Sequence, residues 1–269
     1  MNTSEIKQLS EDAVTKLMEA LERGESQTFK NYLQTMARFH KYSWQNSMLI
    51  ISQCPTASHV AGYQTWRKLG RQVVKGAKGI AILAPLVGKA KPEEQQDGEE
   101  KRLFCFRAVY VFDVASTTGE ELPEFATITG DPQQYMERLT AFVTAKGITL
   151  SYSDEIAPAK GQCSGKAITL LPNLQPAEAF AVLVHEAAHS ALHFGERRKE
   201  TTKKIRETEA EAVAFVVSSA IGLDVNSSCS DYILSYDGTK DTLAESLAFV
   251  QHAASEILQG IAEKVEVLE

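Results

Sequence analysis

The sequence predicts an α+β fold in two domains, residues 1–125 and 126–269. Three observations lead to this prediction. The chain has 269 residues, of which 43% are hydrophobic and 23% charged, so each half can bury a core and a disordered chain is excluded. The charges are divided unevenly along the chain. Helical and strand-like patterns occur in both halves, and the stretch from Pro123 to Pro132 is the candidate boundary.

The N-terminal half begins with a predicted amphipathic helix over residues 4–23, where leucine and alanine recur at helical spacing until Gly24. The polar decapeptide 92–101 would form an exposed loop. The other patterns indicate, in order, a helix over 26–52, a short helix around Trp66, two strands within 71–86 joined by a glycine-containing turn, and a strand over 103–114.

The C-terminal half also mixes helices and strands. No internal repeat of 20–50 residues is present in the chain. The patterns indicate, in order, a helix over 132–146, strands over 148–153 and 166–171, and three helices near 176–194, 200–222 and 241–265.

The charge of the chain is concentrated by segment. The formal net charge is -7, from 35 acidic and 28 basic residues. Residues 26–92 nevertheless contain ten basic residues and no acidic one, which leaves 18 basic and 35 acidic residues elsewhere, a net charge of -17. Such asymmetry is typical of a polyanion-binding module joined to a second module, whereas a short basic run is usually a solvated face. The length of the acid-free window favours the first interpretation.

The compartment is predicted from what the sequence lacks. The N-terminus, MNTSEIKQLSED, has no apolar core of a secretory signal, and no apolar run approaches the roughly 18 residues that span a bilayer. The four cysteines form no Cys-x-x-Cys pair, so free thiols are expected at Cys54, Cys105, Cys163 and Cys229. These features favour a cytoplasmic protein without membrane association.

A metal-binding motif lies in the acidic half, in the sequence His185-Glu186-Ala187-Ala188-His189. Two histidines at i and i+4 lie on one helical face, where both imidazoles can bind a single Zn²⁺. Zinc lowers the pKa of its bound water toward 7, so Glu186 would act as the general base that takes the proton and later gives it to the leaving amine. The alternative is a helix whose histidines make ordinary hydrogen bonds. The apolar neighbours predict burial, where unpaired polar groups are costly, and therefore favour the metal.

A catalytic zinc site needs a third protein ligand and an open fourth position. The metzincin pattern would supply a histidine ten residues after His185, but that residue is Gly195. His193 lies two turns beyond His185, about 12 Å along the axis, and cannot reach the same ion. His193 is therefore interpreted as a structural residue or one that contacts a ligand.

The next predicted helix offers the missing ligand. Glu207 and Glu211 share one face at i and i+4, with Glu207 preferred as the ligand and Glu211 orienting a neighbouring group. A solvated helix face is the alternative for these glutamates, and Glu209 is expected to lie on one. The strand at 165–172, just before the motif helix, could hold an extended peptide along an exposed edge, or have no substrate role.

Aromatic, amide and basic side chains alternate in the basic half. Single-strand binders stack bases on aromatic rings and follow the phosphates with cations. Duplex readers show a helix-turn-helix or a zinc finger, and the sequence contains neither pattern. The tryptophans could equally be core residues. The candidate DNA-binding residues are Lys41, Tyr42, Trp44, Asn46, Trp66, Arg67, Arg71, Lys75 and Lys78.

These segments together resemble the ArdC-like antirestriction family of plasmids and other mobile elements. The resemblance rests on RFHKYSWQNSMLI, AGYQTWRKLGRQVVKGAKGIAILAP and VFDVASTTG in the first half, and on LVHEAAH and RETEAEAVAFVV in the second. It implies an N-terminal α/β single-stranded DNA-binding domain, a C-terminal zincin-like metallopeptidase domain, and protection of incoming DNA from restriction endonucleases. The glutamate helix is also similar to the Glu-x-x-Ala-Asn pattern of ImmA/IrrE-type peptidases. That similarity gives Glu207 the ligand position and places Glu211 where those proteins have Asn.

Three hypotheses follow from the sequence. The first is a single-stranded DNA-binding protein with a gluzincin-like zinc peptidase site that acts on a protein substrate. The second is a DNA-binding protection module whose metal site is structural or inactive. The third is a peptidase that cleaves a DNA-bound regulator, with the basic half serving only to localise it. The oligomeric state is left open.

Overall fold

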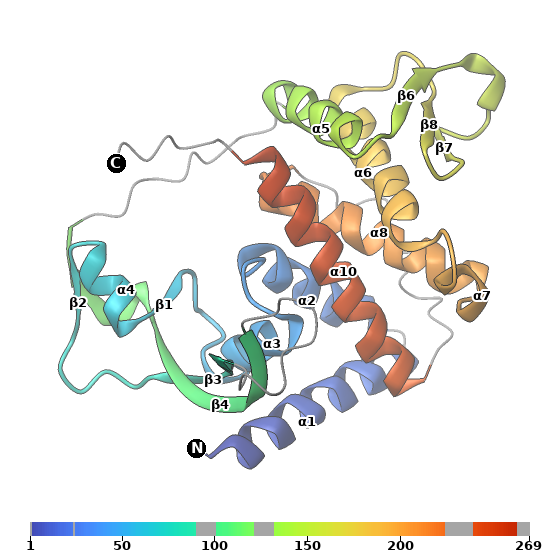
Figure 1. Cartoon of the computed structure of the whole chain (residues 1–269). Helices are drawn as coiled ribbons and strands as arrows, with labels where there is room; N and C mark the ends of the chain where they lie inside the picture. Colours follow the sequence, from blue (N-terminus) through green and yellow to red (C-terminus); the bar gives the residue numbers. More distant parts are fainter. Residues whose placement is uncertain (1, 24, 90–100, 121–131, 224–238, 263–269) are drawn as a thin grey trace. The chain divides into compact units, whose positions relative to one another are not determined.

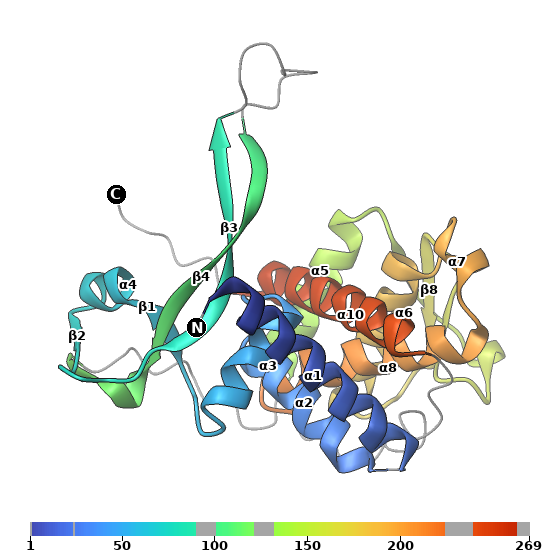
Figure 2. The ribbon, with the colours of Figure 1, turned by 90° about the horizontal axis from the view of Figure 1, so that it is seen from below.

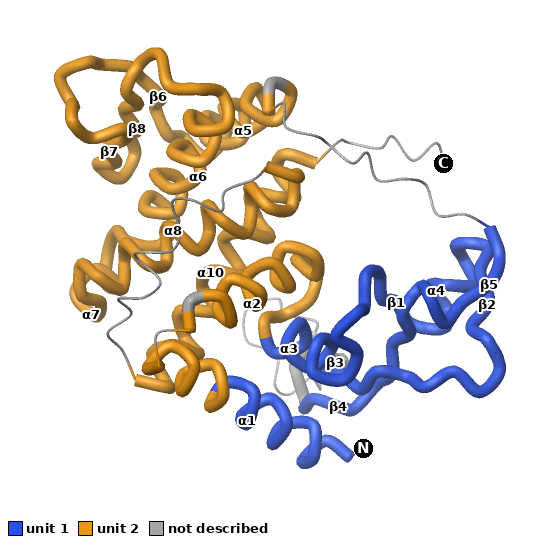
Figure 3. The backbone as a smooth tube through the Cα atoms, turned by 180° about the vertical axis from the view of Figure 1, so that it is seen from behind, with its two compact units in different colours: residues 1–14, 45–123 blue, residues 15–44, 124–269 orange. Residues whose placement is uncertain are grey.

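The structure is a computed structural model that describes residues 2–23, 25–89, 101–120, 132–223 and 239–262 (Figure 1). The chain forms two compact units, which we call unit 1 (residues 1–14 and 45–123) and unit 2 (residues 15–44 and 124–269) (Figure 3). The mixed α+β class is confirmed. Residues 15–44 join the C-terminal half of the chain in unit 2, and the domain boundary at 125/126 stays a prediction.

Unit 1 contains two small antiparallel sheets, with strand orders β1-β4-β3 and β2-β5. The division between the units falls inside α1 (Thr3–Glu22) and at the first residue of α3 (Trp44–Gln53). The other elements are β1 (Val60–Gly62), α4 (Tyr63–Lys68), β2 (Arg71–Val73), β3 (Ile80–Lys89), β4 (Lys101–Asp113), η2 (Val114–Ser116) and β5 (Thr117–Gly119).

The longest strands of unit 1, β3 and β4, form a twisted two-stranded ribbon (Figure 2). They pair from Ile80 opposite Val111 to Lys89 opposite Lys101, with one irregularity between Leu86 and Val87. Short strand β1 pairs with the other side of β4. Among the described residues, therefore, no strand lies beside the outer edge of β3.

Two amide side chains of α3 cover that outer edge of β3. Asn46 donates from Nδ2 to the carbonyl oxygen of Leu83 (2.9 Å) and accepts from the N–H of Leu83 (3.0 Å). Gln53, two helical turns later, pairs in the same way with the carbonyl (2.8 Å) and N–H (3.0 Å) of Ala81. The unpaired N–H and carbonyl groups of an open strand edge can pair with another chain. The two amides occupy these groups at Leu83 and Ala81.

Unit 2 is a helical layer with a three-stranded sheet at one side (Figure 1). The central helix α8 packs against α6, α10 and α2, and from Thr208 to Ser218 every residue except Glu211 is buried. The elements are α2 (Ser26–Arg38), α5 (Gln133–Ala145), β6 (Thr149–Tyr152), η3 (Asp154–Ile156), β7 (Gly161–Cys163), β8 (Ala167–Leu170), α6 (Pro176–Leu192), α7 (Arg197–Glu200), α8 (Lys203–Ala220) and α10 (Lys240–Ile261).

The sheet of unit 2 has the order β6-β8-β7. Strand β8 pairs with β6 in parallel and with β7 antiparallel, so both of its sides are occupied. The expectation that the strand at 165–172 offers an exposed edge is therefore wrong. The edge strand beside α6 is β7, which is only three residues long and was not predicted.

The predicted single helix over 26–52 is wrong, because it is two helices, α2 and α3, separated at residues 39–43. The carbonyl oxygen of His40 accepts hydrogen bonds from Gln251 and Ser255 on α10. In a continuous helix that carbonyl would bond to the N–H four residues later, so the contact with α10 replaces a helical bond. Apolar spacing alone could not reveal this competition.

The remaining sequence expectations divide into three groups. The predicted helices of α1, α4, α5, α6, α8 and α10 and the strands β3, β4, β6 and β8 are confirmed within a few residues. The polar loop and the candidate boundary, at 92–101 and 123–132, lie almost wholly outside the described residues. In the part of the chain that is described, no helix is both long and apolar enough to cross a membrane. Cys54, Cys105 and Cys163 are free thiols, and Cys229 lies outside the described residues.

Candidate metal centre

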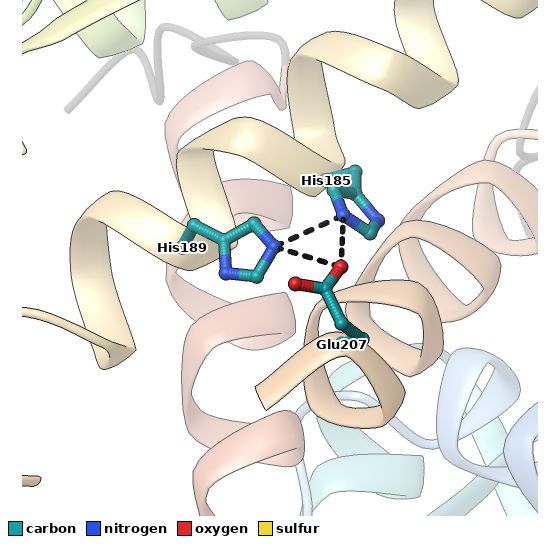
Figure 4. A group of neighbouring side chains, drawn as sticks. All are labelled: His185, His189 and Glu207. Atoms are coloured by element: carbon teal, nitrogen blue, oxygen red, sulfur yellow. Dashed lines mark hydrogen bonds and ion pairs between the residues drawn. The ribbon is translucent and has the colours of Figure 1, made fainter. Parts of the chain in front are cut away.

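The motif helix α6 is oriented by its apolar residues. It begins with Pro176 in the first turn, where the missing N–H of proline costs no helical hydrogen bond. Phe180 and Leu183 are fully buried, which fixes the rotation of the helix about its axis. His185 and His189, one turn apart, then project side by side toward α8 (Figure 4).

Glu207 reaches the two imidazoles from α8 (Figure 4). The Nε2 atoms of His185 and His189 are 3.1 Å apart, and Oε2 of Glu207 lies 3.7 Å from the first and 3.5 Å from the second. The structure thus brings together the three residues that the sequence predicted as ligands. Their ligand atoms all lie within 4.8 Å of one another.

These separations fit one small tetrahedral ion. Ligand atoms held about 2.0–2.1 Å from the centre of a tetrahedron lie about 3.3 Å apart. The separations in the structure, 3.1 to 3.7 Å, are close to that value. Two imidazole nitrogens and one carboxylate are also the ligand types that Zn²⁺ accepts when a fourth position stays open. The three side chains therefore suit a zinc-like ion.

The outer nitrogen of each imidazole is held by a second side chain. Nδ1 of His185 lies 3.2 Å from Oε2 of Glu211, and Nδ1 of His189 lies 2.8 Å from Nδ1 of His193. With a metal bound, a proton on each of these Nδ1 atoms would leave Nε2 unprotonated and able to ligate the ion. Such partners fix the tautomer and the ring orientation of a metal ligand.

A buried polar chain continues behind His189. Nε2 of His193 lies 2.9 Å from Oε2 of Glu209, and both side chains are only 1% exposed. The other oxygen of Glu209 accepts from Ser246 (2.6 Å) and from Arg197. The expectation that Glu209 lies on a solvated face is therefore wrong. The run AVAFVV that follows in the sequence is apolar on every face, which was the available signal that this helix is covered on all sides.

The electrostatics of the centre favour an ion pair when no metal is bound. Burial by itself would lower the pKa of His185, but the neighbouring carboxylates of Glu207 and Glu211 raise this pKa to about 9. The imidazoles of His185 and His189, whose Nε2 atoms lie 3.7 and 3.5 Å from its Oε2, hold the pKa of the Glu207 carboxyl far below its usual range. A metal ion must therefore displace a proton from His185 near neutral pH.

Glu186 lies in the same pocket as the predicted ligands. The pocket has a volume of about 450 Å³, and Gly161 and Cys163 of β7 form part of its wall. Burial raises the pKa of Glu186. A Cβ added to Gly161 would lie 2.7 Å from Oε1 of Glu186, so only glycine leaves room for the carboxylate in this position. Sequence reasoning missed Gly161, because the contact joins residues 25 positions apart.

Three of the predicted DNA-binding residues are structural residues in the core. Trp44 is 7% exposed, Trp66 is 2% exposed, and Trp66 donates from its indole N–H to the carbonyl oxygen of Phe112 (2.9 Å). Asn46 is engaged with the backbone of β3. None of the three offers a free face or amide for a base, so a stacking or base-contacting role is not proposed for them. Burial of an indole with its N–H paired is the ordinary use of tryptophan.

The other predicted DNA-binding residues lie nearer the surface. Arg71 is used internally, since Nε donates to Thr117 Oγ1 (2.8 Å) and a second nitrogen donates to the Thr117 carbonyl (3.2 Å). Tyr42 is half-buried. The exposed cations are Lys41 in unit 2 and Arg67, Lys75 and Lys78 in unit 1.

Exposed aromatic rings of unit 1 were missed at the sequence level. Phe106 and Tyr110 on β4 are 46% and 48% exposed, and they lie on one face of the strand because side chains alternate along it. The ring of Tyr110 lies against Gly79, where an added Cβ would be 3.0 Å from it. The period-two recurrence of aromatics in FCFRAVYVF was the signal for this face.

Comparison with protein families places the N-terminal part of the chain. Residues 4–112 match the family model described as the N-terminal domain of anti-restriction factor ArdC. The chain is therefore ArdC-like in this part, and the resemblance read from the sequence is confirmed there. The predicted metal ligands lie outside the matched residues.

Whole-chain relatives are more distant. An uncharacterized Bacillus anthracis protein, pXO2-81, is 24% identical over 280 residues, which cover 87% of this chain and 48% of the relative. The chain thus spans about half the length of the curated relative it matches. Crystal structures of the antirestriction ArdC protein from plasmid R388 are 21% identical in the metal-free form and 20% in the Mn(II)-bound form. They cover 81% and 82% of this chain and 84% and 85% of their own, each with a TM-score of 0.48.

Proposed function

We propose that this chain is an antirestriction-type protein that binds single-stranded DNA and carries a zinc-dependent peptidase site. The observation that carries the enzymatic part is the convergence of His185, His189 and Glu207 in a pocket that also holds the buried carboxylate of Glu186. The match of residues 4–112 to the N-terminal domain of anti-restriction factor ArdC supports the antirestriction part.

In this proposal His185, His189 and Glu207 hold Zn²⁺, which when bound supplies Lewis-acid activation of a water molecule and of the scissile carbonyl. Glu186 is the general base, and its carboxylate accepts a proton from the attacking water and returns it to the leaving nitrogen. The raised pKa of Glu186 suits both steps, since a group must accept and release the proton at the same pH. Glu211 and His193 keep the imidazole rings in position.

The peptide substrate would lie along β7. In the described part of the chain β8 is the one strand that pairs with β7, and Gly161 and Cys163 line the pocket that contains Glu186. An extended peptide can add to such an edge through main-chain hydrogen bonds. The scissile bond would then pass between the edge strand and the predicted ligands.

The peptidase assignment is tested with the zinc-loaded full chain and a random peptide mixture. Cleavage is followed by mass spectrometry, and bound zinc is measured on the same samples. Glu186→Gln should retain zinc but lose at least about 100-fold of cleavage, as general-base loss typically costs. His189→Ala should bind zinc at least about 100-fold more weakly. His252→Ala, exposed on α10, is the matched control. Full cleavage by Glu186→Gln would show that the general-base assignment is wrong.

For DNA, we propose that the exposed cations Arg67, Lys75 and Lys78 contact phosphates and that Tyr110 and Phe106 take the stacking role first assigned to the tryptophans. Binding of a fluorescent oligo-dT is measured against salt. Replacing Lys75 and Lys78 together by Gln should reduce the slope against log salt by about 1.4, since each single-strand phosphate contact contributes about 0.7. Tyr110→Leu should weaken binding about tenfold. Lys166→Gln, exposed in unit 2, is the control, and a wild-type slope near zero would contradict the proposal.

The other two hypotheses are outcomes of the same variants. A protection module with a structural metal site predicts that Glu186→Gln keeps full protection of DNA against a restriction endonuclease. A peptidase directed at a DNA-bound regulator predicts that cleavage of the regulator requires DNA. Loss of protection in Glu186→Gln, without any DNA requirement for peptide cleavage, favours the proposal above over both.

A further inference from the structure

A cluster of cations lies beside the candidate metal centre, within a half of the chain that is otherwise acidic. Residues 126–269 contain 12 basic and 20 acidic residues, yet six of those 12 basic residues fall within 197–206. Three of the six, Arg198, Lys203 and Arg206, line the pocket that contains Glu186 and Glu207. A local concentration of one sign in a pocket wall attracts groups of the opposite sign.

These three cations have no carboxylate partner among the described residues. Arg206 donates to the backbone carbonyls of Arg198 (3.2 Å) and Thr201, and the Arg198 guanidinium lies 5.8 Å from the ring centre of Phe194. The side chain of Lys203 is exposed and enters no ion pair in the described part of the chain. The neighbouring Lys199, by contrast, pairs with Glu196 at 2.8 Å.

The charges of the pocket sum to a positive value once the site is loaded. A divalent ion balances the carboxylates of Glu186 and Glu207, so Arg198, Lys203 and Arg206 remain as excess positive charge. The exposed ring of Phe194 adds apolar surface at the same wall. A substrate with a negative group close to the reacting bond would complement this wall.

An acidic peptide and a nucleic-acid strand both carry negative charge and could bind at these cations. The edge strand β7 favours the peptide. Gly161 and Cys163 of β7 line the pocket, and main-chain groups of an edge strand pair with an extended peptide. A nucleic-acid strand has no equivalent row of alternating donors and acceptors. We propose that the pocket selects peptides with an aspartate or glutamate next to the scissile bond, read by Arg198, Lys203 and Arg206. This inference rests on the proposed peptidase function.

Two fluorescent hexapeptide hydroxamates test it, identical except that one carries two aspartates and the other two asparagines. The hydroxamate binds zinc in both, so the difference in affinity reports the charge alone. Zinc-loaded full chain should bind the aspartate peptide about tenfold more tightly at low salt, and the preference should shrink at high salt. Lys203→Gln should reduce the preference about threefold, whereas Lys199→Gln, which lies outside the pocket wall, should leave it unchanged.

Each other outcome is informative. Equal binding of the two peptides by the wild-type chain overturns the acidic preference while leaving the zinc site intact. Binding of neither peptide by a chain with full zinc content means that the proposed peptidase function fails, and the inference with it. Displacement of the aspartate peptide by unlabelled oligo-dT at an equal concentration would indicate that Arg198, Lys203 and Arg206 bind the phosphates of DNA instead. Arg198→Gln, an exposed residue, provides a second variant if Lys203→Gln alters folding.

Discussion

The metal pocket of unit 2 and the DNA-binding residues of unit 1 were both predicted from side chains in the sequence. The structure brings the predicted metal ligands together, but it buries several of the predicted DNA-binding residues. In the pocket, the three predicted ligands converge from α6 and α8. In unit 1, Trp66 and Asn46, two of the residues predicted to contact DNA, are core or backbone-pairing residues. The pocket residues were chosen by their spacing on a helix, which is a geometric property. The DNA residues were chosen by composition, which does not say which face of an element is exposed.

The largest expected effect comes from the buried chain behind the pocket. Glu209→Ala removes the shared partner of buried His193 and Ser246 and of the mostly buried Arg197. Removing one member of a buried charge pair leaves the other uncompensated, so the free energy of unfolding should fall by about 3–5 kcal/mol. Chemical denaturation followed by circular dichroism measures it.

Glu245→Ala is the matched control for that variant. Glu245 pairs with the same arginine, at 3.2 Å, but its side chain is 56% exposed. An exposed ion pair contributes at most about 1 kcal/mol, so this variant should unfold almost like the wild type. Equal destabilisation by the two variants would mean that the chain from His189 to Glu209 is not an integral part of the core.

The next variant should impair the predicted general base, Glu186, without affecting the predicted metal ligands. Gly161→Ala places a methyl group 2.7 Å from Oε1 of Glu186 and 2.6 Å from a methyl carbon of Val182. The carboxylate must move, so peptide cleavage should fall at least about tenfold while zinc content stays at the wild-type level. Gly62→Ala, where no atom lies within 4 Å of the added carbon, should change neither. Unchanged cleavage in Gly161→Ala would argue that Glu186 acts from another position.

Zinc binding should also depend on pH. The pKa of His185 is raised to about 9 without metal, so zinc must displace a proton at any lower pH. Zinc affinity should therefore rise up to about tenfold per pH unit from pH 7 and level off above pH 9. Conversely, the stability that the protonated ring gives the metal-free chain is present below about pH 6.5 and is lost as the pH rises through 9. Competition with a chelating indicator of known pH dependence measures the affinity.

Glu211→Gln tests the cause of that pH profile. The amide retains a hydrogen bond to Nδ1 of His185 but lacks the negative charge that helps to raise its pKa. The level region should therefore begin at a lower pH in this variant. A profile identical to that of the wild type would assign the proton to another group.

The last variant tests whether Trp66 of unit 1 is a core residue or a DNA-binding residue. Trp66→Phe removes the indole N–H that donates to the carbonyl oxygen of Phe112. The free energy of unfolding should fall by about 1–2 kcal/mol, since a buried acceptor loses its partner. Binding of oligo-dT by the folded variant should stay within about twofold of the wild type. A tenfold loss of DNA binding without a change in the free energy of unfolding would indicate that Trp66 contacts DNA after all.

The sequence alone predicted what depends on the local geometry of a single helix. The pairing of His185 with His189, and the position of Glu186 one residue further round, follow from 3.6 residues per turn, whatever packs outside. Most helices and the longer strands were predicted for the same reason, because the period of their apolar residues is a local property.

Tertiary structure decided which face of each element is covered. Glu207 meets α6, Glu209 turns inward to Arg197 and Ser246, and Glu211 supports His185, although all three belong to one run of alternating glutamates. Their roles depend on where α6, α10 and α2 pack around α8, and no spacing within α8 contains that information. The same holds for β3, whose open edge α3 covers with Asn46 and Gln53. The role of a polar side chain depends on the group with which it forms a hydrogen bond or ion pair, and the tertiary fold determines which group lies beside it.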